Sequence, residues 1–476
     1  MLQVPADLAY ARGYRQPTRC AMQVDLLIHN ADWVANPDET PPAAHQSIAI
    51  RDGWIVALGA ADELAVEARE TLDARGLILI PGLINTHQHF LESLTRAMPA
   101  AQNDPLLPWL SKHYPFWAAV EPSHLAIATR QAAVELLRSG CTTVFDHNYL
   151  WPNGCQVEDQ IEVMQALGLR FHVSRGSISL GQSRGGVAPD QAVEDEGHIL
   201  RDSERVIDRW HDPSPGSRLQ VALAPGSPYS VSAALMRETA TLARDKGVRL
   251  HTHLAESRDE VDFCRQQHRE TPVTHVEGMG WLGPDVWFAH MIHPSSTDLQ
   301  RLASHGCGIS HCPCSNMRLG NGIAPVRAFL DRSMPVGIGV DGGASNDAAN
   351  LLAETRQTML LQRVAHGAAA MTAREALTLA TAGGAKVLGR TDIGRLEVGM
   401  AADIAGFRLD ALEMAGGAVH DPLGALVFCP PPCADLVVVD GEPRVRRGEV
   451  LGQDLGALVA EHNQAARAIV RAASRA

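Results

Sequence analysis

Short apolar runs alternate with amphipathic stretches over most of this chain, and the alternation predicts its architecture. Between residues 81 and 392, strand-like apolar runs are separated by alanine- and leucine-rich stretches with helical spacing, such as 123–139 and 233–246. Eight of these runs end at Thr86, Asp146, Arg175, Pro225, His253, His290, His311 and Asp341. Eight β-α units in series are typical of a closed parallel barrel, whose active site lies at the C-terminal ends of the strands.

The two ends of the chain have a different pattern, in which short strands are separated by tight turns. Near the N-terminus, strands are predicted over 25–29, 47–51, 54–58 and 76–80. The Asp52-Gly53 pair lies between two of these apolar runs and indicates a hairpin. Beyond residue 393, strand-like runs return at 436–440 and 444–446, before a predicted helix over 455–473.

These patterns together predict an α/β protein that combines a (β/α)8 TIM barrel with a small β-sandwich domain formed by both chain ends. We expect residues 81–392 to form the barrel, and residues 1–80 and 393–476 to form the sandwich and the terminal helix. Residues 1–21 have little pattern and are expected to be an extension. The length of 476 residues suits one large barrel with an accessory domain.

Charge and composition restrict the expected partners and compartment. The formal net charge of −13 argues against nucleic acid and anionic membrane surfaces as partners, because both demand a basic face. Small neutral or cationic ligands fit this charge. No apolar run reaches the roughly 18 residues that a transmembrane helix requires, and the first 20 residues lack the apolar core of a signal peptide. Since the nine scattered cysteines fit reduced thiols, we expect a cytoplasmic protein.

A metal site is predicted where the strands end. His87 and His89 lie two residues apart, so both imidazoles can face one ion if the chain is extended there. Such a pair also arises by chance in a chain with 21 histidines. The prediction gains weight from His253 and Asp341, because the ends of barrel strands converge on one axis. Three imidazoles and one carboxylate suit a single divalent ion, for which we expect Zn²⁺, with Fe²⁺ as the alternative.

The same strand ends carry candidates for proton transfer. Glu256 follows His253 by three residues and could face the ion without binding it, which would let it move a proton during hydrolysis. The alternative is an ordinary carboxylate at a helix N-terminus. His290 could be a fifth ligand or could contact the attacking oxygen, and we favour the second role. Asp341 suits two roles, as ligand and as base, although His290 and Asp341 could also be polar caps of barrel strands.

One absence favours a single metal ion. Barrel hydrolases with two metal ions commonly bridge them with a modified lysine at the end of the fourth strand. The corresponding stretch here, residues 222–229, reads Ala-Leu-Ala-Pro-Gly-Ser-Pro-Tyr and has no lysine.

Four motifs, taken in order, resemble the amidohydrolase superfamily, and in particular its single-metal aminohydrolase branch. They are Pro-Gly-Leu-Ile-Asn-Thr-His-Gln-His at 81–89, His-Thr-His-Leu-Ala-Glu at 251–256, Ala-His at 289–290 and Gly-Val-Asp at 339–341. Finer stretches at 142–149, 174–181, 311–319, 342–347 and 359–363 resemble bacterial 8-oxoguanine deaminases, and triazine hydrolases share several of them. Gln88 departs from these deaminases, in which a histidine often stands between the two ligands, and matches some triazine hydrolases.

The resemblance implies a zinc-dependent hydrolytic deaminase of 8-oxoguanine, forming urate and ammonia, with guanine or isocytosine as further substrates. It also implies a homo-oligomer and a small aminated heterocycle as the substrate. Metal binding would fall to His87, His89, His253 and Asp341, and catalysis to Glu256, His290 and Asp341. Candidates to hold the ring are Gln88, Trp109, His147, Arg175 and Asn316. Trp109 could instead pack within its loop, and His147 and Arg175 could instead brace a loop.

Three alternatives remain at this point. The same chemistry would serve a hydrolase of substituted triazines of the hydroxyatrazine type, or a pterin deaminase, and only the shape of the pocket separates these from a purine deaminase. A third alternative is an inactive barrel kept as a metal-binding scaffold. Such a protein would be expected to have lost ligands or the proton carrier, and this chain retains all of them.

Overall fold

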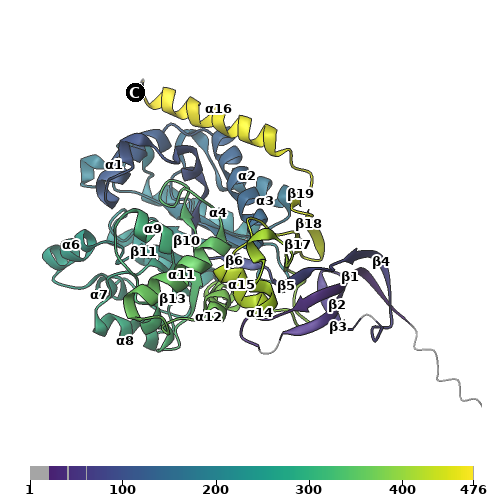
Figure 1. Ribbon diagram of the computed structural model, residues 1–476. Helices are drawn as coiled ribbons and strands as arrows, with labels where there is room; N and C mark the ends of the chain where they lie inside the picture. The colour runs from purple at the N-terminus through teal and green to yellow at the C-terminus, as the bar shows by residue number, and fades with distance from the viewer. Residues whose placement is uncertain (1–20, 40–41, 61, 475–476) are drawn as a thin grey trace, which may run out of the picture.

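The computed structural model describes residues 21–39, 42–60 and 62–474, and its centre is a closed barrel of eight parallel strands (Figure 1). Neighbouring strands follow the order β10-β11-β12-β13-β14-β6-β8-β9. Their bounds are β6 Leu83–Asn85, β8 Cys141–Asp146, β9 Arg170–Ser177, β10 Leu219–Pro225, β11 Arg249–Leu254, β12 Val286–His290, β13 Gly308–His311 and β14 Val336–Ile338. The predicted barrel is therefore confirmed, and most predicted strand ends lie within two residues of the observed ones.

The strands form a barrel because most of their residues are buried on both faces, as in a parallel sheet covered by helices. Strands β9 and β11 also carry arginine and histidine side chains. Helices from the intervening segments surround the barrel strands. They are α2 Pro122–Arg138, α3 Val157–Leu167, α4 Glu196–Trp210, α5 Ala233–Lys246, α6 Arg258–His268, α7 Pro272–Glu277, α8 Ser296–Ser304, α9 Pro313–Arg318, α10 Val326–Leu330, α11 Leu351–His366, α12 Ala373–Thr378 and α13 Gly384–Val387.

The eighth strand ends earlier than the apolar pattern predicts. We expected it to reach Asp341, but β14 ends at Ile338. Asp341 instead begins the short strand β15 (Asp341–Gly342), which pairs in parallel with β7 (Gln88–His89). The chain turns here because Asp341 adopts a left-handed conformation, with φ of 61°. This small two-stranded sheet places Asp341 directly beside the first histidine pair.

Both chain ends contribute to one further sheet of nine strands, with the order β19-β18-β17-β16-β5-β1-β2-β3 and β4 paired to β1. Its bounds are β1 Met22–Val34, β2 Ala43–Arg51, β3 Trp54–Gly59, β4 Val66–Asp73, β5 Leu77–Pro81, β16 Ile404–Arg408, β17 Leu436–Val439, β18 Glu442–Arg446 and β19 Glu449–Val450. Side chains from both ends enclose an apolar cluster of their own, which includes Ile28, Ile50 and Val438. The predicted shared β unit and its Asp52-Gly53 hairpin are confirmed. Of the predicted extension, residues 1–20 lie outside the described residues.

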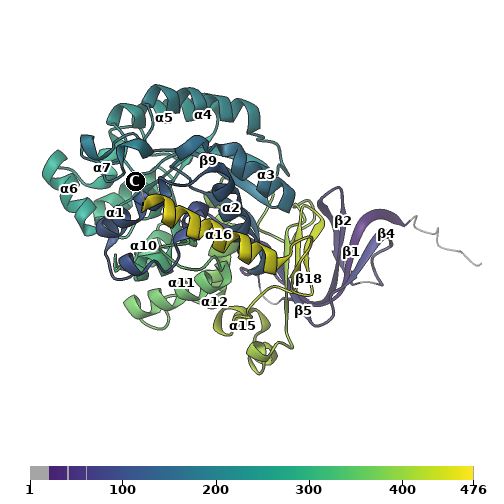
Figure 2. The same cartoon turned by 90° about the horizontal axis from the view of Figure 1, so that it is seen from above.

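The remaining helices lie near the barrel mouth and along its side. They are α1 Leu106–Trp117, the 3-10 helix η1 Phe90–Thr95, α14 Gly417–His420, α15 Pro422–Phe428 and the C-terminal helix α16 Leu455–Ala473. Helix α16 crosses α2 and also contacts α1 and η1 (Figure 2). None of the described helices is both long and apolar enough to cross a membrane.

Candidate active site

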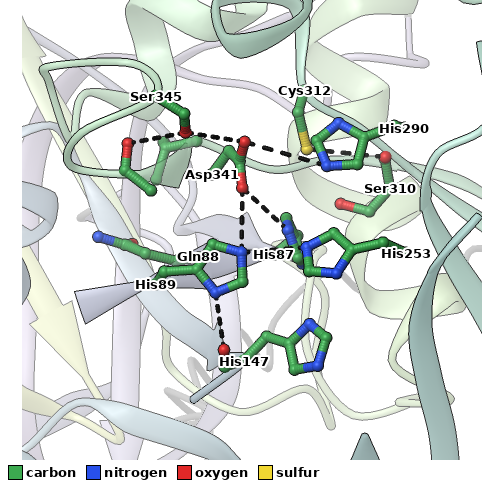
Figure 3. Close-up of polar contacts among 12 residues, drawn as sticks. His87, Gln88, His89, His147, His253, His290, Ser310, Cys312, Asp341 and Ser345 are labelled. Carbon is green, nitrogen blue, oxygen red and sulfur yellow. Dashed lines mark hydrogen bonds and ion pairs between the residues drawn. The ribbon is translucent and has the colours of Figure 1, made fainter. Parts of the chain in front are cut away.

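Four predicted ligands from three separate parts of the chain converge at the mouth of the barrel (Figure 3). The Nε2 atoms of His87 and His89 lie 3.0 and 3.3 Å from Oδ1 of Asp341. His253, from β11, places its Nε2 3.1 Å from Nε2 of His89. His87, His253, Asp341 and the neighbouring His290 each offer a ligand atom, and these atoms all lie within 4.8 Å of one another.

Hydrogen bonds to backbone carbonyls orient the imidazoles of this cluster. Nδ1 of His89 lies 2.7 Å from the carbonyl oxygen of His147, and Nδ1 of His253 lies 2.5 Å from that of Gly226. A carbonyl can only accept, so each Nδ1 carries a proton and each Nε2 is turned toward the centre. Support of this kind for the outer ring nitrogen is typical of histidines that bind metal ions.

The charge states of the cluster also fit a divalent cation. Burial lowers the pKa of His87 to about 3 and that of His253 well below its usual value, so both rings are neutral and can bind metal. Burial opposes ionisation of Asp341, but the surrounding histidines outweigh it and hold the pKa well below the usual range. Burial would also lower the pKa of His89, yet the carboxylates of Glu92 and Asp341 raise it to about 9. The carboxylates therefore favour positive charge at the position of His89, where a cation would bind.

Glu256 and His290 lie next to this cluster without joining its closest contacts. Oε2 of Glu256 is 3.8 Å from Nε2 of His290, which in turn is 3.9 Å from Oδ2 of Asp341. Burial raises the pKa of the Glu256 carboxyl. Its other oxygen accepts a hydrogen bond of 2.9 Å from Asn321. Glu256 can therefore take up and release a proton within reach of the cluster.

The backbone around these groups is held in unusual conformations. His290 and Asp341, together with Ala255 beside Glu256, adopt φ values of 68°, 61° and 52°. Non-glycine residues in this region carry strain, and such strain is concentrated at functional sites. The turns direct the side chains toward one point at the C-terminal ends of the strands.

A cavity of about 290 Å³ opens from the cluster. His89, His253, Glu256, His290 and Asp341 line its deep end. Its outer part is mostly apolar and is lined by Leu106, Trp109, Leu110, Val187, Phe263 and Leu319. The cavity therefore offers a polar floor under an apolar entrance, which suits a flat heterocyclic ligand.

Of the five residues predicted to hold the substrate ring, only Trp109 lines this cavity. Arg175 is buried elsewhere, where its guanidinium binds the carboxylates of Glu194 and Asp202 at 2.8 and 2.6 Å. Gln88 points away from the two neighbouring histidines and accepts a hydrogen bond of 2.7 Å from Asn85.

The other two predicted ring-binding residues support the histidines from behind. The ring of His147 stacks on His253 with centroids 4.7 Å apart, and its Nε2 lies 2.9 Å from the carbonyl oxygen of Ala224. Oδ1 of Asn316 lies 3.0 Å from Nδ1 of His290, which donates because an amide oxygen can only accept. Asn316 thereby directs Nε2 of His290 toward the cavity.

Several residues at the site were missed in the sequence. Glu92, Tyr114, Tyr149 and Ser345 line the cavity. Ser345 donates a hydrogen bond of 2.9 Å to Oδ2 of Asp341. These residues carry no spacing signal of their own, and only the proximity of Glu92 and Ser345 to predicted ligands along the chain could have suggested them.

Comparison with known proteins supports this geometry. A sequence model of the amidohydrolase family matches residues 78–444. The chain therefore belongs to the amidohydrolase family, and the enzymatic class that its motifs predicted is confirmed.

Individual relatives extend over nearly the whole chain. The 8-oxoguanine deaminase of Pseudomonas aeruginosa is 46% identical over 92% of this chain and 99% of its own length. An isoxanthopterin deaminase from an unknown prokaryotic organism is 35% identical over 94% of this chain and 98% of its own length. Among solved structures, the atrazine chlorohydrolase of Arthrobacter aurescens TC1 complexed with zinc has a TM-score of 0.87 at 34% identity and covers 93% of this chain and 100% of its own.

Proposed function

We propose that this chain is a zinc-dependent hydrolytic deaminase of 8-oxoguanine, which it converts to urate and ammonia, with guanine and isocytosine as further substrates. The observation that carries the proposal is the 46% identity to an 8-oxoguanine deaminase across 99% of that protein. The close contacts among His87, His89, His253 and Asp341 at the barrel mouth support the same chemistry.

In this proposal, His87, His89, His253 and Asp341 would hold one zinc ion. A bound zinc ion supplies hydroxide at neutral pH, because it lowers the pKa of water from about 15.7 toward 7. The neutral rings of His87 and His253 and the ionised carboxylate of Asp341 are the forms that bind such an ion. The zinc reported for the related atrazine chlorohydrolase favours this metal.

The reaction adds water to C2 of the purine and breaks the bond from C2 to the exocyclic nitrogen. Glu256 accepts a proton from the attacking water and delivers it to the ring nitrogen or to the departing amine, which leaves as ammonia. His290 presents Nε2 to the attacking oxygen, because its Nδ1 is bound to Asn316. Asp341 orients the same oxygen through Oδ2, whose direction is set by the hydrogen bond from Ser345.

Helix α1 supplies the cover that limits bulk water. Leu106, Trp109 and Leu110 all line the outer cavity. A dry site strengthens the electrostatic contacts of the buried carboxylates with the reacting atoms. The predicted role of Trp109 against the substrate ring fits its place in this cover.

Ammonia release by the zinc-loaded protein tests the proposal directly. The panel is 8-oxoguanine, guanine, isocytosine, isoxanthopterin and a hydroxytriazine, compared by kcat/KM. We expect the highest kcat/KM for 8-oxoguanine. A preference for the pterin or the triazine would retain the mechanism and overturn the proposed substrate.

A second candidate is deamination of a pterin or hydrolysis of a substituted triazine. The isoxanthopterin deaminase and the atrazine chlorohydrolase each cover more than nine-tenths of this chain at about a third identity. The apolar entrance also leaves room for a ring larger than a purine or for an alkylated one. The same panel separates these substrates.

We further propose that the protein acts in the cytoplasm as a homo-oligomer. Eight cysteines among the described residues are free thiols, which fits a reducing compartment. Light scattering coupled to gel filtration would measure the assembly, and a monomeric mass would overturn that part of the proposal.

A further inference from the structure

One carboxylate in the cavity has no part in the mechanism above. Glu92 lies in η1, three residues beyond His89, and lines the cavity with Asp341 and Ser345. Its exposed fraction is 3%. Oε2 of Glu92 has no hydrogen-bond partner among the described residues.

An unpartnered carboxylate oxygen at this depth calls for an explanation, because burying such a group without a partner costs stability. A glycine also leaves space for the Glu92 carboxylate. A Cβ atom built on Gly342, the residue after Asp341, would lie 1.6 Å from Oε2 of Glu92. The glycine therefore lets the Glu92 carboxylate lie against the segment that carries a metal ligand, at the edge of the cavity.

The charges around the cavity indicate what the missing partner is. Its lining contains the acidic residues Glu92, Glu256, Asp259, Glu260 and Asp341, and no lysine or arginine among the residues that the structure describes there. No lysine or arginine of the lining is therefore available to pair with Glu92, and Oε2 of Glu92 receives no hydrogen bond from His89. The proposed metal ion would be held by three histidines and Asp341, which leaves Glu92 free to face the ligand.

We propose that Glu92 is a substrate-binding residue that accepts a hydrogen bond from an N–H group of the heterocycle and thereby selects rings that carry this donor. The inference rests on the proposed deaminase function and adds a specificity-determining residue to it. Glu256 and Glu92 have separate tasks: Glu256 moves protons, whereas Glu92 holds the ring. An N-methylated ring at the same position loses the donor and is discriminated against.

Glu92→Gln tests this assignment, because the amide keeps the shape of the side chain and replaces one of its two oxygen acceptors by an NH2 donor. The wild type and the variant are compared on 8-oxoguanine and on its 1-methyl, 7-methyl and 9-methyl derivatives. We expect the substitution to raise KM for the parent base at least tenfold, with kcat changed less. For the one derivative whose methyl group replaces the N–H bound by Glu92, the substitution should change KM less than threefold.

Calorimetric binding of the same four compounds to zinc-loaded protein gives a readout that does not depend on turnover. It is measured in Glu256→Gln and in Glu256→Gln/Glu92→Gln, so that no ligand is consumed. Glu354→Gln is the matched control, since Glu354 is equally buried, receives hydrogen bonds from Asn346 and Cys314, and does not line the cavity. Glu354→Gln should change the binding affinity for all four compounds by the same factor.

Two results would overturn the assignment. One is an equal loss for the parent base and all three methyl derivatives, which indicates a purely structural role. The other is an affinity of Glu256→Gln/Glu92→Gln for the parent base that lies within twofold of the affinity of Glu256→Gln. Failure of the proposed function gives a different result, because wild-type protein would then release no ammonia from 8-oxoguanine but would turn over another compound of the panel. The N–H and N-methyl forms of that compound are then compared in the same way.

Discussion

Nδ1 of His87 lies 2.9 Å from Nε2 of His251, a histidine that does not line the cavity. His251 in turn places its own Nδ1 2.9 Å from the carbonyl oxygen of Trp287. Because that carbonyl can only accept and burial lowers the pKa of His251 well below its usual value, Nε2 of His251 is an acceptor. His87 must donate from Nδ1, and its Nε2 lone pair faces the ligand cluster.

Replacement of His251 should therefore weaken metal binding without removing a ligand. We expect His251→Leu to lower zinc affinity by about 10- to 100-fold, the usual effect of losing the group that orients a metal-binding histidine. His251→Gln, whose amide oxygen can accept from His87, should retain more of the affinity. Competition with a fluorescent zinc chelator measures both, and His253→Ala, which lacks a ligand, should bind no stoichiometric zinc.

Glu256→Gln separates metal binding from proton transfer. We expect unchanged zinc content and a fall in kcat of about 10² to 10⁴, the range that a positioned acid or base contributes. Elemental analysis and steady-state kinetics measure the two quantities. A kcat near that of the wild type would show that another group moves the proton.

Acid should destabilise the folded protein through His462 in the C-terminal helix. His462 of α16 lies 3.1 Å from Oγ of Ser93, the neighbour of Glu92, and burial lowers the pKa of His462 to about 4. The unfolded form binds a proton near pH 6.5 and the folded form does not, so stability falls as the pH drops from 6.5 to 4, by at most about 1.4 kcal/mol per pH unit.

His462→Gln cannot titrate and should flatten this dependence. We expect the wild type to lose thermal stability more steeply than the variant between pH 6.5 and 4, with parallel curves above pH 7. Parallel curves over the whole range would contradict the assigned role of His462.

A buried ion pair joins the barrel to the sheet formed by the chain ends. Nε of Arg170, at the start of β9, lies 2.7 Å from Oδ2 of Asp403, and both side chains are nearly inaccessible to solvent. Arg170→Met leaves a buried charge unpaired and should destabilise the protein by about 3 to 5 kcal/mol in urea unfolding. The double variant Arg170→Met/Asp403→Asn should recover part of this loss, whereas additive losses would argue against a direct interaction.

The barrel and the polar residues at its mouth were predictable from sequence because both depend on local pattern. A strand buried on both faces needs a continuous apolar run, and a run that ends in His253 or His290 marks a polar group at the strand end. Barrel topology then brings all such ends to one axis, whatever their separation in sequence. The sharing of one sheet by both chain ends was predicted for a similar reason, since short strands at both ends need partners, and the structure pairs β16 with β5.

Other strands were not predicted because their sequences show little hydrophobic periodicity. Strand β4 alternates half-buried and exposed residues and has few apolar side chains. The short pair of β7 and β15 is held by two residues on each side and by the left-handed turn at Asp341, which leaves no trace in hydrophobic periodicity.

What the sequence by itself determined is the barrel, the shared terminal sheet and the placement of His87, His89, His253, His290, Glu256 and Asp341 on the side of the barrel where its strands end. Only the tertiary structure decided which other polar groups meet the cavity. Arg175 pairs with Glu194 and Asp202, whereas Oε2 of Glu92 has no hydrogen-bond partner among the residues that the structure describes. Periodicity specifies which face of an element is buried, but the partner of a buried polar atom depends on segments that pack together from distant parts of the chain, as Ser93 and His462 do.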